Sequence, residues 1–212
     1  NMNFAPVLDI FSNPQNEVIG NRSFGDNPKT VSEHGIAVMK GLQGKNIISV
    51  VKHFPGHGDT HVDSHIGLPV VEYGRERLDS FEFVPFKKAI DSGAEAIMTA
   101  HIIYPELDSK RPATMSREIL TRISRQEMGF EGLIITDDLE MGAITENYAL
   151  EEAALEAVSA GADMLLVCHS NEHQKQVLGR LKAAVQKGDL TMERVDESVA
   201  RIIWLKKKYG MN

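Results

Sequence analysis

The sequence predicts an α/β protein in which short parallel strands alternate with helices, and three observations carry this prediction. Five short runs have the apolar composition of buried strands: 3–8, 47–51, 96–100, 133–136 and 164–168. Amphipathic helical patterns separate these runs, and the glycines that end three of the helices lie 36 and 32 residues apart, at Gly93, Gly129 and Gly161. A period of this length indicates βα units that feed a parallel sheet.

The predicted strands share a further feature, which is a polar residue at the carboxyl end. These residues are Asp9, Lys52 with His53, His101, Asp137 and His169. In a (β/α) barrel all the strand ends face one pocket, whereas a doubly wound sheet opens a crevice at only one or two of them. The phosphate-loop patterns GxGxxG and GxxxxGK[ST] do not occur. We therefore expect a TIM-type (β/α)8 barrel.

The barrel is expected to be a single domain over residues 1–212 that is incomplete at its N-terminal side. Five strands are visible, whereas a closed barrel of this type has eight. The chain also opens at Asn1, directly into a strand-like run and without an initiator Met. We expect the missing strands to lie upstream, or in stretches that the pattern does not reveal.

The helices follow from capping and stop signals. Residues 30–33 (TVSE) form a capping-box sequence that predicts a helix to about Leu42, with Gly44 as its stop. Further helices are expected to start at Pro85 and Ser116, and to run over 150–160, 174–186 and 194–209. Each glycine that ends a helix is predicted to adopt the left-handed conformation before the next strand.

Composition excludes several classes of protein. The net charge is -7, from 23 basic and 30 acidic residues, which argues against a nucleic-acid partner. No stretch approaches the roughly 18 apolar residues of a membrane span. The single cysteine, Cys168, excludes an intrachain disulfide, and its apolar surroundings predict a buried thiol.

The stretch 51–69 (VKHFPGHGDTHVDSHIGLP) is the one around which the rest of the chain is arranged. An apolar strand delivers Lys52 and His53 to its carboxyl end, and then all apolar periodicity stops. Pro55, Gly56 and Gly58 are incompatible with a regular helix, so a long polar loop follows. Loops that gather titratable groups beside a rigid strand are common sites of chemistry.

Within this loop, Asp63-Ser64-His65 is a candidate acid–base pair. A carboxylate two residues from an imidazole can orient it and favour its protonated form, as general acid–base catalysis requires. The alternative is an Asx-type turn with a solvated histidine.

A second candidate is the stretch 134–141 (IITDDLEM), where a short apolar strand ends in Asp137 and Asp138. One of the two carboxylates can face the pocket while the other points away. The alternative is that an acid here caps a helix beginning near Leu139.

A third candidate is the series His53, His57, His61 and His65, which are spaced four residues apart. On a helix this spacing would favour a metal site, but the proline and the glycines between these histidines interrupt any helix. A metal-dependent hydrolase stays as an alternative function, because His and Asp are common zinc and iron ligands.

Four motifs together give the chain a resemblance to a known family. KHFPGHGDTHVDSH, NFAPVLDI followed by NPQNEVIGNRSFG, AIMTAHI and GLIITDDLEMGAI resemble, in this order, the glycoside hydrolase family 3 β-N-acetylhexosaminidases. The resemblance implies a TIM-type barrel and a retaining hydrolase that removes N-acetylglucosamine from the non-reducing end of cell-wall muropeptides or of chitooligosaccharides. It implies no metal and no organic cofactor.

The resemblance also implies roles for individual residues. Asp137 matches the nucleophile of the family, His65 its general acid/base, and Asp63 the partner of that histidine. The residues that match the family's sugar-binding positions are Arg22, Lys52 and His53. A further sugar-binding acid comes from an earlier strand in this family, and the missing N-terminal segment is therefore expected to be required for activity.

Alternatives within and outside the family stay open. A histidine acid/base becomes neutral when it gives up its proton, so it would not repel phosphate, and a glycoside phosphorylase or a family 3 β-glucosidase is compatible with the motifs. Outside the family, the alternatives are the metal-dependent hydrolase and a catalytically silent sugar-binding barrel. The location of the protein, in the bacterial cytoplasm or outside it, is not indicated.

Overall fold

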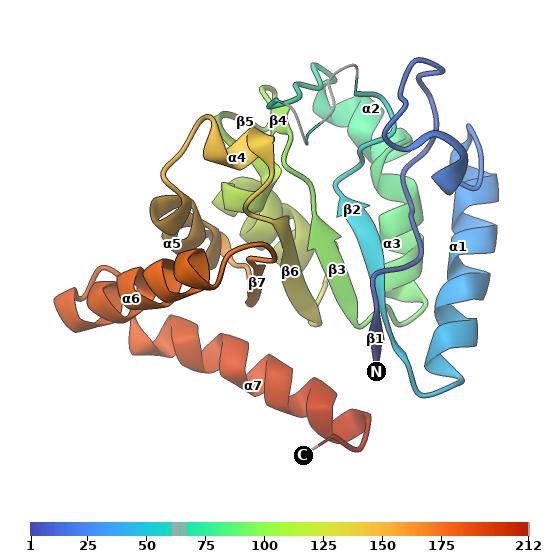
Figure 1. Cartoon of the computed structure of the whole chain (residues 1–212). Helices are drawn as coiled ribbons and strands as arrows, with labels where there is room; N and C mark the ends of the chain where they lie inside the picture. Colours follow the sequence, from blue (N-terminus) through green and yellow to red (C-terminus); the bar gives the residue numbers. More distant parts are fainter. Residues whose placement is uncertain (61–63, 65–66, 212) are drawn as a thin grey trace.

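The computed structural model describes residues 1–60, 64 and 67–211 (Figure 1). Its central element is a five-stranded parallel sheet in the order β1-β2-β3-β6-β7. The strands are β1 (Met2–Asn3), β2 (Ile48–Phe54), β3 (Ala96–Thr99), β6 (Leu133–Asp138) and β7 (Met164–Leu166). The sheet is curled and forms half of a barrel. A closed eight-stranded barrel, as we expected from the strand ends, is not formed by the residues described.

Helices cover the outer face of the curled sheet. They are α1 (Pro28–Gln43), α3 (Phe83–Asp91), the π-helix η3 (Glu118–Glu127) and α5 (Leu150–Ala160). Neighbouring side chains on a strand point to opposite faces, so Val51, Ile97 and Ile134 pack against these helices. This outer layer forms the largest apolar cluster among the described residues.

The inner face of the sheet has its own apolar cluster. Val50, Met98 and Ile135 point to this face, where Leu205 of α7 (Met192–Lys208) and Tyr209, the residue directly after that helix, complete the packing. Helix α7 runs along the bottom of Figure 1, below the amino ends of the strands. α6 (Asn171–Lys187) packs against α5 and leads along the chain into α7. The inner face is thus closed from below, while the carboxyl ends of the strands stay accessible.

The segments that follow the strands gather at the carboxyl ends, at the top of Figure 1. They include α2 (Arg75–Ser80), α4 (Gly142–Thr145), and the antiparallel pair β4 (Ile103–Tyr104) and β5 (Asp108–Pro112). The 3₁₀ turns η1 (Gly20–Arg22) and η2 (Ala113–Met115) complete the elements. The sequence patterns did not reveal these short elements, because each has too few residues for a period.

The first strand is shorter than predicted. The ladder with β2 covers only Met2 and Asn3, and an isolated bridge joins Val7 to Lys52. Pro6 lies between these two pairings and has no N–H to donate, so it interrupts the ladder. The chain nevertheless follows β2 closely, because Leu8 N donates to the Lys52 carbonyl oxygen at 2.6 Å.

Two predictions at helix ends were wrong. Helix α1 is capped by the side chain of Asn27, which accepts from Thr30 N, and Pro28 fills its first position, so Thr30 is not the cap. After this helix Gly44 has φ -64°, and the left-handed residue is Asn46 with φ 59°. By contrast, Gly93, Gly129 and Gly161 have positive φ angles, as predicted.

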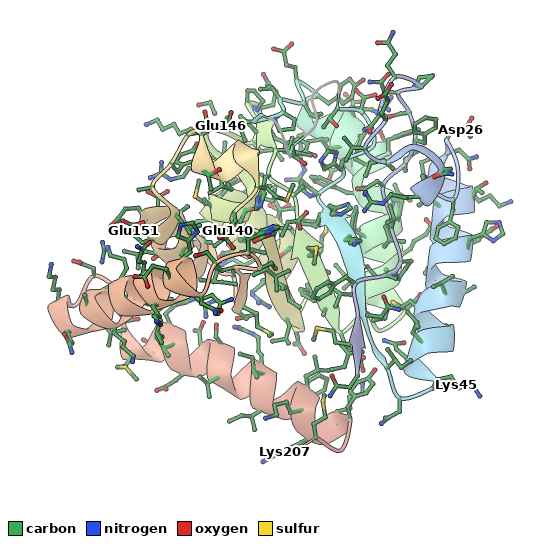
Figure 2. All side chains as sticks on the ribbon, viewed as in Figure 1. Asp26, Lys45, Glu140, Glu146, Glu151 and Lys207 are labelled. Atoms are coloured by element: carbon green, nitrogen blue, oxygen red, sulfur yellow. The ribbon has the colours of Figure 1, made fainter. Side chains whose placement is uncertain are left out.

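Cys168 is exposed, which corrects the expectation of a buried thiol. Strand β7 ends at Leu166 and is the last strand in the sheet order, so no neighbouring strand in the described part of the chain covers the residues that follow. Figure 2 shows that charged side chains such as Asp26, Lys45, Glu146 and Lys207 lie at the periphery of the molecule. None of the helices in the described part of the chain is both long enough and apolar enough to cross a bilayer.

Candidate active site

Asp137 lies near the carboxyl end of β6, a strand that pairs with β3 on one side and β7 on the other. Its side chain is 23% exposed, and its Oδ1 accepts from Asp138 N at 2.9 Å. The Asp138 carboxylate instead accepts from Glu140 N and Cys168 N and lies 2.9 Å from His169 Nε2. One acid is therefore available at the strand end, while its neighbour holds the loop after β7. No helix starts near Leu139, since α4 begins at Gly142.

Strand β2 supplies the side chains of Lys52 and His53. In a regular strand two successive side chains point to opposite faces. Here the pairing with β3 shifts register between Val51 and Phe54, and both residues face the same cavity. Nε2 of His53 lies 4.0 Å from Oδ2 of Asp137.

These side chains line a cavity of about 190 Å³ at the carboxyl ends of the strands. It is lined by Val18, Arg22, Lys52, His53, His57, Ser64, Asp137 and Met141. A larger cavity of about 870 Å³ lies between β7, α6 and the start of α7, but its lining is mainly aliphatic. Convergent titratable groups identify a site better than volume does, so the smaller cavity is the candidate active site.

The charges around Asp137 favour its ionised form. Burial would raise the pKa of Asp137, but the electrostatic interactions with His53 and His101, the N–H of Asp138 and the charge of Lys52 together hold it below its usual value. Burial and the neighbouring Arg22 lower the pKa of Lys52, although Asp137 and Asp9 oppose this shift. The cavity therefore combines an ionised carboxylate with a set of basic groups.

The polar loop after β2 is fixed to the segment after β1. Asn16 Nδ2 donates to the carbonyl oxygen of His57 at 2.7 Å, and Asn13 Nδ2 donates to that of Thr60 at 3.1 Å. Ser12 Oγ donates to Asp59 Oδ1 at 2.9 Å. The loop is thus held in place by side chains of the preceding unit rather than by a helix or strand of its own.

Ser64, the middle residue of the Asp-Ser-His motif, lies at the cavity. Its Oγ is 2.9 Å from His57 Nε2, and its carbonyl oxygen accepts from Ala143 N at 3.1 Å. Both His57 ring nitrogens lie near hydroxyls, because Nδ1 is 3.0 Å from Thr60 Oγ1. Burial, followed by the charge of His53, lowers the pKa of His57 to about 4. His57 is therefore neutral at neutral pH, and its ring links Thr60 to Ser64 within the loop after β2.

His101, which follows β3, has no function predicted from its place in the sequence. Its Nε2 lies 2.9 Å from the carbonyl oxygen of Asp138, and its Nδ1 lies 2.8 Å from Thr114 Oγ1. Nε2 must carry a proton, since a carbonyl oxygen only accepts. His101 therefore holds the backbone directly after Asp137. The position of His101 after a predicted strand indicated that it lies near the site. Its distance along the sequence from Asp138 could not show that it contacts the carbonyl oxygen of that residue.

The structure brings together four of the predicted site residues: Arg22, Lys52, His53 and Asp137. Asp63 and His65 lie outside the described residues, as does His61 of the histidine series. Among the residues that the structure describes, no three His, Cys, Asp or Glu side chains are arranged to hold a metal ion. In particular, both ring nitrogens of His57 already lie beside hydroxyl groups, as given above.

Residues 1–205 match the family model described as the glycosyl hydrolase family 3 N terminal domain. The chain belongs to glycosyl hydrolase family 3. This membership confirms the resemblance seen in the motifs. The half-barrel of the described residues is consistent with the barrel-like N-terminal domain of the family.

Similar proteins support the same placement of this family 3 chain. It is 39% identical to a protein named beta-hexosaminidase A from Pseudoalteromonas piscicida, with 98% of this chain and 38% of that protein covered. A family 3 β-N-acetylglucosaminidase from Paenibacillus sp. str. FPU-7 is 47% identical, with a TM-score of 0.98 over 99% of this chain and 40% of that one. A structure titled beta-glucoside phosphorylase BglX is 30% identical, with a TM-score of 0.93 over 99% of this chain and 39% of that one. The chain thus spans less than half the length of each of these three relatives.

Proposed function

We propose that the protein is a retaining exo-β-N-acetylglucosaminidase that acts on muropeptides derived from peptidoglycan or on chitooligosaccharides. The observation that carries the proposal is the ionised Asp137 at the end of β6, which faces a cavity lined by Lys52, His53 and Arg22. The names of two relatives, a beta-hexosaminidase and a β-N-acetylglucosaminidase, support the choice of sugar.

The proposed reaction has two steps on opposite faces of the sugar ring. In the first, Asp137 attacks the anomeric carbon, the bond to the leaving oxygen breaks, and His65 gives that oxygen its proton. In the second, His65 takes a proton from water, and the water oxygen displaces Asp137 from the anomeric carbon. Asp63 is proposed to orient His65. Retention of configuration follows, because the anomeric carbon inverts twice.

The cavity chemistry suits the first step. A nucleophile must be ionised, and the basic groups around Asp137 keep it so. Lys52 and Arg22 are proposed to donate hydrogen bonds to the sugar hydroxyls and the N-acetyl group, and His53 is proposed to contact the same groups through Nε2. No metal or organic cofactor is needed for either step.

The first test replaces Asp137 in the full-length protein. Asp137→Asn should lower kcat on a chromogenic N-acetyl-β-glucosaminide by about three orders of magnitude or more, because the amide cannot form the ester intermediate. Asp138→Asn is the matched control, since the neighbouring carboxylate binds the loop after β7 and should cost far less activity. Wild-type turnover by the Asp137→Asn protein would refute the assignment of the nucleophile.

His65 is tested by its dependence on the leaving group. His65→Ala should lower the rate strongly on a substrate with a sugar leaving group, and much less at the glycosylation step on an activated aryl substrate, because a good leaving group needs little protonation. Equal losses on both substrates would contradict the role of His65 as the acid. Activity that persists with a chelator would argue against the metal-dependent alternative, and any turnover would exclude a silent sugar-binding protein.

Phosphorolysis is the second candidate function, and a specific likeness favours it. The structure titled beta-glucoside phosphorylase is similar over nearly the whole chain. In this chain the cavity also carries Lys52 and Arg22, which could bind a phosphate at the second step. Turnover in phosphate buffer distinguishes the two, since phosphorolysis yields a sugar 1-phosphate that ³¹P NMR detects and hydrolysis yields the free sugar.

A further inference from the structure

Asp9 is a fully buried carboxylate beside the candidate active site, and the reaction proposed above gives it no role. It follows the bridge between Val7 and Lys52, so the backbone holds it against the end of β2. Burying a charge is costly unless it is paired and hydrogen-bonded. The groups that bind the Asp9 carboxylate therefore indicate which residues it positions.

The two carboxylate oxygens of Asp9 have different partners. Oδ1 accepts from His57 N at 2.7 Å and from His53 N at 3.1 Å. Oδ2 lies 2.7 Å from His53 Nδ1 and also accepts, at 3.2 Å, from His53 N. Backbone N–H groups are permanent donors, whereas a histidine ring nitrogen can be either donor or acceptor. Backbone N–H groups thus hold one oxygen of the carboxylate. The other oxygen faces the His53 ring nitrogen, whose role as donor or acceptor depends on the tautomer.

Asp9 stays ionised in this site. Burial would raise its pKa, but the interaction with His53, the hydrogen bond from the His53 ring and the hydrogen bond from the backbone N–H of His57 outweigh burial and lower it. An ionised carboxylate can only accept hydrogen bonds. His53 Nδ1 must therefore carry a proton, and this directs Nε2 toward Asp137, whose Oδ2 is 4.0 Å away.

We propose that Asp9 is a positioning residue that keeps the proton of His53 on Nδ1 and thereby presents Nε2 to the sugar beside Asp137. This role for Asp9 rests on the proposed function. It adds to that function a residue that affects the sugar through the contact made by His53. With Nδ1 bound to Asp9, neutral His53 offers a lone pair at Nε2 that can accept from a sugar hydroxyl. The protonated ring offers a second N–H at the same point. In either state the ring orientation is fixed before substrate arrives.

Asp9→Asn distinguishes this role from a packing role, because it reverses the tautomer while keeping the volume. The asparagine must turn its oxygen toward the two backbone N–H groups, which cannot change. Its NH₂ group then faces His53 Nδ1, which becomes an acceptor, and the proton of the neutral ring moves to Nε2. An Asp-to-Asn change behind a catalytic histidine is known to act in this way in serine proteases.

The experiment uses the full-length protein with ¹⁵N-labelled histidine, and it assigns His53 by its loss in His53→Gln. Wild-type His53 should carry a proton on Nδ1 at every pH where the protein is folded, and in Asp9→Asn the neutral ring should carry its proton on Nε2. A wild-type ring with a bare Nδ1 would overturn the proposal, and this measurement does not depend on how any Asp9 variant folds.

Kinetics supply the second arm. Asp9→Asn should lower kcat/KM on the chromogenic N-acetyl-β-glucosaminide by on the order of 100-fold, the scale of a misplaced contact group. In Asp9→Asn/His53→Gln the loss should equal that of His53→Gln alone, because Asp9 acts through His53. Additive losses, or an Asp9→Asn protein within about threefold of wild type, would overturn the proposal.

Asp59→Asn is the matched control. Asp59 joins the same two segments, through Ser12, but makes no contact with the His53 ring. It should change neither the His53 tautomer nor kcat/KM appreciably. If the wild-type protein fails to turn over the substrate, the proposed function fails, whereas the tautomer measurement still tests Asp9 on its own.

Discussion

Asp137 and Asp138 are adjacent residues of the same type, yet their surroundings separate their roles. Asp137 is flanked by His53, His101 and Lys52, which keep it ionised at the cavity. Asp138 is bound to backbone N–H groups of the next two loops and to His169. Alternation along β6 sends the two side chains in opposite directions, so one can serve chemistry and the other can serve structure.

At the same scale, His57 makes stability depend on pH. Its folded-state pKa of about 4 lies below the value near 6.5 of an unfolded chain. Between these values the unfolded state binds a proton that the folded state does not, so stability is present above the unfolded pKa and is lost as the pH falls. Protonation of His57 should lower the free energy of unfolding by about 3 kcal/mol once the pH is below both pKa values. Burial lowers the pKa of His101 as well, with the same sign.

The prediction is checked by urea denaturation between pH 7 and 4.5. His57→Gln removes one titrating group but keeps a side chain that can bond to Ser64 and Thr60. Its free energy of unfolding should fall less steeply with decreasing pH than that of the wild-type protein. His34→Gln is the control for the substitution itself, because it makes the same change at an exposed histidine on α1. Identical slopes for the wild type and His57→Gln would show that His57 does not titrate on unfolding.

At the scale of elements, close approach between loops matters more than regular structure around the site. Gly58 lies where the loop after β2 crosses the segment after β1. A Cβ at this position would lie 1.7 Å from the carbonyl oxygen of Ile10. The atoms that this Cβ would meet are the backbone atoms of Ile10, which cannot rotate away as a side chain could. The loop after β2 and the segment after β1 would therefore have to separate, and the hydrogen bonds from Ser12, Asn13 and Asn16 would be strained.

Gly58→Ala should therefore destabilise the protein by about 2 kcal/mol or more and lower activity, since the loop forms part of the cavity. Gly41→Ala is the matched control, because its Cβ would meet nothing within 4 Å and the residue is inside helix α1. There the substitution should stabilise by about 0.5–1 kcal/mol. Thermal unfolding of the two variants measures both effects, and a neutral Gly58→Ala would show that the segments are not held together in solution.

At the scale of the whole molecule, one buried carboxylate connects the last helix to the sheet. Asp163 precedes β7, and its side chain is fully buried. It accepts from Ile134 N at 3.0 Å, from Arg125 of η3 at 2.6 Å, and from Ser198 of α7 at 2.8 Å. Arg194 and Arg201 of α7 also donate to it. This arrangement fixes α7 below the inner face, opposite the cavity.

Asp163→Asn should lower the free energy of unfolding by about 3–5 kcal/mol, because buried guanidinium groups would lose their counter-charge. In the wild-type protein burial lowers the pKa of Arg125 to about 10, so this arginine is charged at neutral pH and depends on the counter-charge of Asp163. Glu152→Gln removes the exposed pair with Arg180 and should change stability little. Chemical denaturation of both variants compares the two, and equal effects would contradict the role of Asp163.

Sequence reasoning was most successful where a feature is local. Five strands, most of the helices and the positive φ angles of three glycines were predicted from apolar runs and capping signals, because these depend on residues that are neighbours in sequence. The predicted cap at Thr30 failed because Asn27 offers a better acceptor directly before Pro28. The buried thiol at Cys168 failed because burial there depends on a neighbouring strand, which a local pattern cannot reveal.

The sequence by itself determined the alternation of strands and helices, the family, and the polar residues at the strand ends, since each of these follows from the type and order of residues. Only the tertiary structure decided that the described strands form half a barrel, that Asp9 contacts His53 and that His101 holds the backbone after Asp137. Such contacts join residues more than 30 positions apart, and their geometry depends on how the sheet curls. Residue spacing contains no information about that curvature, whereas atomic distances do.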